Sequence, residues 1–64
     1  MPNLDIEIFS GRSVDQKRDL VRRLTDAVVE SLAVTPESVR VRIVEVEKDN
    51  LANAGILKAD AEAR

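Results

Sequence analysis

Hydrophobic and polar residues alternate over residues 3–9, which predicts a β-strand at the start of the chain. Leu4, Ile6 and Ile8 fall on one side of this segment, and the residues between them are polar or charged. A period of two over this length is typical of a strand with one buried face. Residues 10–12 then interrupt the pattern with a turn, because the glycine among them adopts backbone angles that other residues resist.

Residues 14–32 carry hydrophobic side chains at steps of three and four, which predicts one amphipathic helix. Ser13 and Gln16 fit a capping box at its start, in which each side chain bonds the backbone of the other residue. The apolar stripe comprises Leu20, Val21, Leu24, Ala27, Val28, Ser31 and Leu32. Charged residues occupy much of the remaining surface, and we interpret them as a face exposed to solvent.

β-Branched residues dominate residues 39–47 and predict a second strand. Pro36 precedes this segment and either ends the helical continuation or starts a short turn. The residues of one face are Val39, Val41 and Ile43, and those of the other are Arg40, Arg42, Val44 and Val46. Residues 51–56 predict a short hairpin with Asn53 and Gly55 in its turn. A tail of about residues 57–64 follows, and its polar, Ala-rich residues 59–64 predict a frayed end.

The order strand, helix, strand predicts a single α+β domain over residues 1–64, built as one β-α-β unit with parallel strands and a right-handed crossover. Two strands with one helix are marginal alone, since the helix covers only one face of the sheet. The other face still carries Phe9, Val44 and Val46, and both sheet edges are unpaired. Because one chain cannot bury the apolar side chains on both faces of its sheet, the sequence predicts an obligate oligomer.

Composition strengthens the expectation of an oligomer. A chain of 64 residues without cysteine or histidine lacks disulfides and the usual zinc ligands. Small domains without such cross-links commonly oligomerise. Phe9 is the one aromatic residue, so the core must be aliphatic. We expect no metal and no organic cofactor.

Charge argues against two classes of partner. Ten basic and twelve acidic residues are interspersed and give a net charge of −2. Proteins that bind nucleic acids or membrane surfaces usually display a basic patch instead. The sequence also shows neither a signal peptide nor an apolar run long enough for a membrane span. We expect a cytoplasmic protein that binds neither nucleic acid nor membrane.

Several short motifs, spread over residues 2–47, together resemble a known family. They are Met1-Pro2, Gly11-Arg12-Ser13, Gln16-Lys17, Ser31-Leu32 and Ser38-Val39-Arg40-Val41, followed by Ile43 and Glu45. At these separations they resemble the 4-oxalocrotonate tautomerase family, the small subunits of the tautomerase superfamily. The resemblance implies the β-α-β fold with a C-terminal hairpin, assembled as a homohexamer from three dimers.

The resemblance also implies a reaction and a site. In the family the initiator Met is removed, and the N-terminal proline, here Pro2, is the catalytic base. Arg12 and Arg40 match the arginines that bind substrate carboxylates, and different subunits supply them to one site. The implied activity is that of an isomerase, a keto–enol tautomerase acting on a small anionic 2-oxo or 2-hydroxy dienoic acid such as 2-hydroxymuconate.

Two positions depart from the family pattern. Leu51 stands where a bulky aromatic residue is usual, and Arg42 stands where an aliphatic residue is common, on the same strand face as Arg40. Both are candidate substrate contacts. Arginines suit the chemistry in three ways. Their positive charge lowers the pKa of a nearby amine and stabilises a developing enolate. Their guanidinium groups bind a carboxylate through a pair of hydrogen bonds.

Other interpretations stay open. Taken singly, Pro2 fits an ordinary chain start, Arg12 a solvated turn residue, and Arg40 and Arg42 charges that discourage edge pairing. The superfamily also includes dehalogenases, hydratases and decarboxylases. A further alternative is one subunit of a mixed hexamer with little activity alone. A ribbon-helix-helix DNA-binding dimer begins similarly but needs a second helix where residues 39–46 predict a strand.

Overall fold

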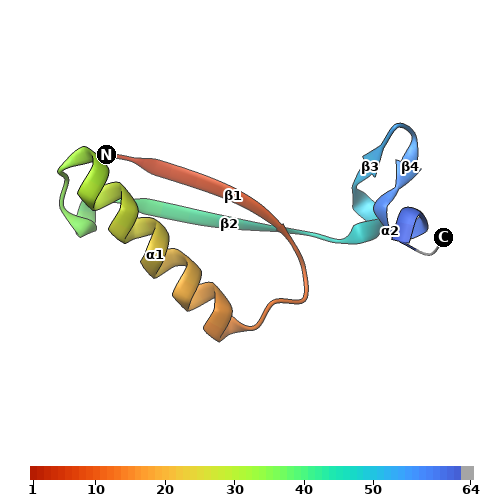
Figure 1. The fold of residues 1–64 in the computed structure, drawn as a ribbon, viewed down its shortest axis with the longest axis horizontal. Helices are drawn as coiled ribbons and strands as arrows, with labels where there is room; N and C mark the ends of the chain where they lie inside the picture. Colours follow the sequence, from red (N-terminus) through yellow and green to blue (C-terminus); the bar gives the residue numbers. More distant parts are fainter. Residues whose placement is uncertain (63–64) are drawn as a thin grey trace.

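Two parallel strands with one helix across a single face form the body of the molecule (Figure 1). The computed structural model describes residues 1–62. Its elements are β1 (Asn3–Phe9), α1 (Val14–Leu32), the 3-10 turn η1 (Pro36–Ser38), β2 (Arg40–Val46), the 3-10 turn η2 (Lys48–Asn50), β3 (Ala52–Asn53), β4 (Ile56–Leu57) and α2 (Lys58–Glu62). None of the helices in this part of the chain is long and apolar enough to cross a membrane. The predicted β-α-β unit with a C-terminal hairpin is confirmed.

The register of the two strands decides which side chains share a face. β1 and β2 pair in parallel from Asn3 opposite Arg40 to Phe9 opposite Val46. Exposed and half-buried residues alternate along most of β1, as the sequence pattern predicts. Because successive side chains of a strand point to opposite faces, the two arginines of β2 lie on one face with Asn3 and Asp5.

Helix α1 begins at a capping box and is tied to the sheet by an ion pair. The backbone N–H of Gln16 donates to Ser13 Oγ at 3.1 Å, and the Ser13 N–H donates to Gln16 Oε1 at 3.0 Å, so the predicted box is confirmed. One turn further, Lys17 Nζ lies 2.7 Å from Glu45 Oε1 on β2. This contact fixes the first turn of the helix against the end of the sheet where β1 and β2 finish.

The C-terminal segment differs in two details from the sequence-based prediction. Its hairpin turns at Ala54 and Gly55, both with positive φ (55° and 79°), whereas Asn53 was predicted in the turn and belongs to β3. The prediction of a frayed end is wrong for residues 59–62, which belong to α2, while residues 63–64 lie outside the described part. Lys58 N–H donates to the Leu51 carbonyl at 2.8 Å, so a backbone contact stabilises the start of α2.

The region of β2 excludes the ribbon-helix-helix interpretation. That fold requires a second helix after α1, but Arg40–Val46 is a strand bonded along its length to β1. A 3-10 turn precedes it, closed by the Val39 N–H donating to the Pro36 carbonyl at 3.1 Å. This bond keeps Val39, which was predicted as the first strand residue, outside β2.

The single chain has almost no core. Of the residues described, none is buried, and Met1, Leu32 and Val14 are 83%, 60% and 59% exposed. The radius of gyration is 15.2 Å, whereas a compact domain of this length has about 11 Å. The accessible surface is 5096 Å², against about 4,100 Å² for a compact monomer of this mass. These values agree with a chain that needs partner subunits to bury its apolar surface.

Candidate active site

Pro2 lies at the amino end of β1 and is fixed there by the backbone of β2. The Arg40 N–H donates to the Pro2 carbonyl at 3.0 Å, which brings the start of both strands together. Pro2 is half-buried, while Met1 is 83% exposed. In the full-length chain the Pro2 nitrogen is an amide, so it becomes a basic amine only when Met1 is removed. The exposure of Met1 leaves that bond open to a processing enzyme.

A polar pocket of about 230 Å³ opens beside this strand end. Its lining residues are Asn3, Leu4, Asp5, Arg40 and Arg42. Arg42 Nε lies 3.6 Å from Asp5 Oδ1 across the sheet. The predicted site residues Arg40 and Arg42 are therefore brought together in one pocket with Asp5, and the backbone of Arg40 also bonds Pro2. Asp5 was not among the residues predicted for the site, although a parallel register starting at residues 3 and 40 pairs it with Arg42.

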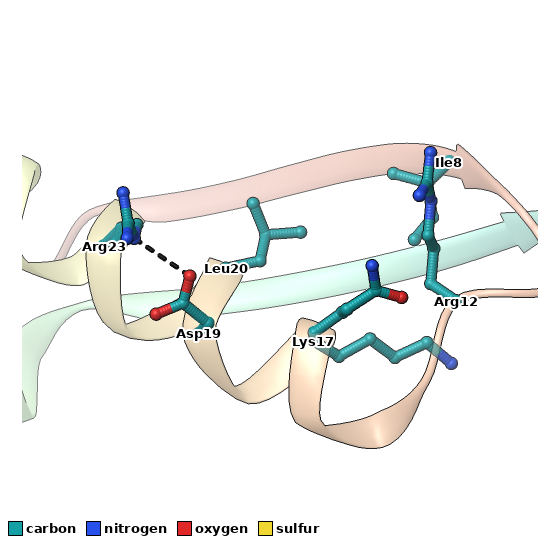
Figure 2. A pocket seen from close by; sticks show the side chains of 7 residues that line it. Ile8, Arg12, Lys17, Asp19, Leu20 and Arg23 are labelled. Atoms are coloured by element: carbon teal, nitrogen blue, oxygen red, sulfur yellow. Dashed lines mark ion pairs between the residues drawn. The ribbon is translucent and has the colours of Figure 1, made fainter.

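Arg12 lies at the opposite end of β1, in the turn that leads into α1. Gly11 precedes it with φ of 115°, a backbone angle that favours glycine. Arg12 lines a cleft of about 350 Å³ between β1 and α1, over an apolar floor that includes Ile8 and Leu20. Figure 2 shows the Arg12 side chain beside Ile8, with Leu20 further along the helix. The arrangement can hold an anion whose remaining part is apolar.

Among the arginines of residues 1–62, Arg12 and Arg40 differ from the others in having no carboxylate partner. Four of the six arginines within residues 1–62 form ion pairs with aspartates, namely Arg18, Arg22, Arg23 and Arg42. Figure 2 marks one of these pairs, between Arg23 and Asp19 at 2.9 Å. In the same part of the chain, Arg12 and Arg40 have no acidic oxygen within the 4.0 Å that defines an ion pair. Their guanidinium groups are thus available to an external carboxylate.

One chain does not bring these two arginines to one ligand. The seven residues of β1 separate the Arg12 end from the end that holds Pro2 and Arg40. At about 3.3 Å per residue the strand is about 23 Å long. A small substrate cannot span that distance. A site that contains Pro2 together with both arginines therefore requires at least two subunits.

Leu51 lies at the Arg12 end of the sheet, in the segment between η2 and β3. It is 40% exposed and lines a small cavity of about 130 Å³ with Phe9 and Val46. Lys48 Nζ lies 6.0 Å from the centroid of the Phe9 ring. Within its own chain Leu51 therefore does not reach Pro2, and any contact with the same substrate also depends on a second subunit. No group of three or more acidic side chains that could hold a metal ion gathers within residues 1–62.

A parallel β-α-β unit with a C-terminal hairpin and a proline before its first strand defines the class of small tautomerase subunits. The model of the tautomerase enzyme family matches residues 2–61, and the chain belongs to this family. The family assignment suggested by the sequence motifs is thereby confirmed.

Relatives of known name are similar over nearly the whole chain. A 2-hydroxymuconate tautomerase of Bacillus subtilis is 39% identical over 62 residues, covering 97% of this chain and all of the relative. A 4-oxalocrotonate tautomerase isozyme of Methylibium petroleiphilum superposes with a TM-score of 0.91 at 37% identity, covering 97% of each chain. A heterohexameric 4-oxalocrotonate tautomerase of Chloroflexus aurantiacus superposes with a TM-score of 0.86 at 35% identity, covering 94% of this chain and 97% of the other.

Proposed function

We propose that the protein is a keto–enol tautomerase in which Pro2, freed by removal of Met1, is the general base. The substrate is a small 2-oxo or 2-hydroxy dienoic acid such as 2-hydroxymuconate. One observation carries the proposal: the backbone bond from Arg40 to the Pro2 carbonyl holds an arginine without an acidic partner next to the proline. The naming of the relative from Bacillus subtilis supports the choice of substrate.

In the proposed reaction the Pro2 amine takes the proton of the enol hydroxyl, and the resulting ammonium returns a proton to carbon. The enol becomes a ketone, and the amine ends unprotonated, so the proton balance closes. Arg40 and Arg12 bind the carboxylates of the substrate, and their charge stabilises the enolate that forms between the two proton transfers. The same positive charge disfavours the protonated form of the amine, so that more of the amine is neutral and able to accept a proton. Arg42 and Leu51 complete the proposed set of substrate contacts.

The proposed enzyme is a homo-oligomer, because a site with Pro2 and both arginines requires at least two subunits. The resemblance to the 4-oxalocrotonate tautomerase family favours a homohexamer. The alternative of a mixed hexamer is favoured by the similarity to a heterohexameric relative. Light scattering on the protein purified alone should give a particle several times heavier than the 7.1 kDa chain. A stable monomer would contradict the core argument, and an inactive oligomer of this chain alone would favour the mixed hexamer. The cytoplasmic location predicted from the sequence stays a prediction.

The test of the activity is a spectrophotometric assay of a substrate panel. The enzyme is first shown by intact mass to lack Met1, and then mixed with 2-hydroxymuconate and with phenylenolpyruvate. We expect the dienol absorbance of 2-hydroxymuconate to decay faster than in buffer, in proportion to enzyme concentration. An Arg18→Ala variant should retain this activity, since Arg18 pairs with Asp15 on the outer face of α1. Turnover of a halogenated or decarboxylating substrate instead would move the assignment to those branches of the superfamily.

A further inference from the structure

We propose that Arg40 and Arg42 together clamp one substrate carboxylate, and that Asp5 is a built-in competitor that holds Arg42 while the site is empty. The proposal rests on the proposed function only in taking the ligand to be a substrate carboxylate. It assigns to Asp5 a role in setting affinity: a ligand gains the second arginine only by displacing the Asp5 carboxylate.

The geometry of the two arginines suits a single anion. They stand two residues apart on β2, so their side chains leave the same face of the sheet with origins about 6.6 Å apart. Both line the polar pocket near the amino end of β1. Their planar guanidinium groups each offer parallel N–H donors that match a carboxylate. All the residues of the clamp belong to one chain, so it forms whichever subunit supplies the amine.

The position of Asp5 makes it a competitor for the same ligand. It is directly opposite Arg42 in the strand register, and it offers the same functional group as the substrate. The distance of 3.6 Å between Asp5 Oδ1 and Arg42 Nε is longer than a hydrogen bond. Within the single chain both side chains are well exposed, at 74% for Arg42 and 70% for Asp5. Exposed pairs of this kind are weak, so an incoming carboxylate can replace Asp5.

Selectivity follows from this exchange. A carboxylate ligand replaces the Asp5 carboxylate as the partner of Arg42, whereas a neutral ester or ketone offers Arg42 no negative charge in exchange. The ratio of the affinity for an acid to the affinity for its ester is therefore larger with both arginines than with Arg40 alone.

The experiment measures binding of a saturated, unreactive dicarboxylate, adipate, by isothermal titration calorimetry on the assembled protein without Met1. The variants are Asp5→Asn, Arg42→Met and the double variant. Asp5→Asn should lower the Kd about 2- to 5-fold, the range that corresponds to losing an exposed ion pair. Arg42→Met should raise the Kd about 10-fold or more. When Arg42→Met is already present, adding Asp5→Asn should leave the Kd for adipate unchanged, because there is no Arg42 for Asp5 to hold.

Controls separate the clamp from general charge effects. Asp15→Asn and Arg18→Met alter a similarly exposed pair on α1 and should leave the Kd unchanged. Arg42→Lys keeps the positive charge but lacks the planar guanidinium group, so its Kd for adipate should lie between those of wild type and Arg42→Met. It replaces Arg42→Met in the test if light scattering shows that Arg42→Met does not assemble. The proposal is overturned if Arg42→Met binds adipate as wild type does, or if Asp5→Asn tightens binding equally without Arg42. Because adipate binding needs no turnover, an absence of tautomerase activity counts against the proposed function alone.

Discussion

Protein that carries an uncleaved N-terminal tag should lose tautomerase activity by about 10²- to 10⁴-fold, the contribution typical of a general base. The tag leaves the Pro2 nitrogen in a peptide bond, where it has no lone pair for a proton. The remaining parts of the site are untouched, because the Arg40 N–H bonds the Pro2 carbonyl and not its nitrogen. The measurement is kcat/KM for 2-hydroxymuconate, compared with the same tag placed at the C-terminus.

Two further observations make that comparison decisive. Light scattering should give the same particle mass for both tagged forms, which excludes a failure of assembly as the cause of the loss. A Pro2→Ala variant without Met1 keeps an amine but lacks the ring that fixes its direction, and its activity should lie between the two tagged forms. Equal activity of the two tagged proteins would show that Pro2 is not the base.

Arg12→Ala and Arg40→Ala should each lower kcat/KM by about 10²-fold or more, and a mixture of the two should regain activity that neither has alone. Within one chain β1 holds these arginines at opposite ends, so each site must combine arginines from different subunits. When subunits of both variants are dissociated in urea, combined and reassembled, some sites receive an intact Arg12 from one chain and an intact Arg40 from another. Activity per subunit is then measured against each variant treated alone.

The controls for the mixing experiment come from the outer face of α1. Arg18→Ala and Arg22→Ala remove arginines that pair with aspartates of the same helix, and both should remain active throughout. A wild-type sample taken through the same urea cycle reports the yield of reassembly. If the mixture of Arg12→Ala and Arg40→Ala stays as inactive as its parents while the wild-type sample regains activity, the two arginines act in sites supplied by one and the same chain.

The main elements were predictable because each depends on a local pattern. Alternation gave β1, steps of three and four gave α1, and Ser13 with Gln16 marked the helix start. The C-terminal segment was harder, since its conformation depends on contacts made elsewhere. The Leu51 carbonyl accepts a bond from Lys58, and this contact between residues seven apart has no signature in the propensity of an Ala-rich tail. Ala54 adopts positive φ without being glycine, so composition pointed to a neighbouring residue instead.

The candidate site was predictable residue by residue but not as an arrangement. Pro2, Arg12 and Arg40 followed from the resemblance of short motifs. That Arg12 and Arg40 lack acidic partners, whereas Arg42 has Asp5, depends on the strand register and side-chain geometry. Asp5 also stood unremarked because an aspartate on the exposed face of a strand is ordinary. Its significance arises only when the two strands are aligned.

The length of β1 limits which insertions and deletions this protein can accept during evolution. The strand connects two places of chemical importance, the proline end and the Arg12 end, and so it sets the spacing between them. Deleting one residue would move its apolar side chains to the other face. Deleting two would restore the faces but draw Arg12 back by about 6.6 Å. Insertions and deletions are thus restricted along β1 by two sites at once, while the hairpin beyond Lys48 is free of that double restriction.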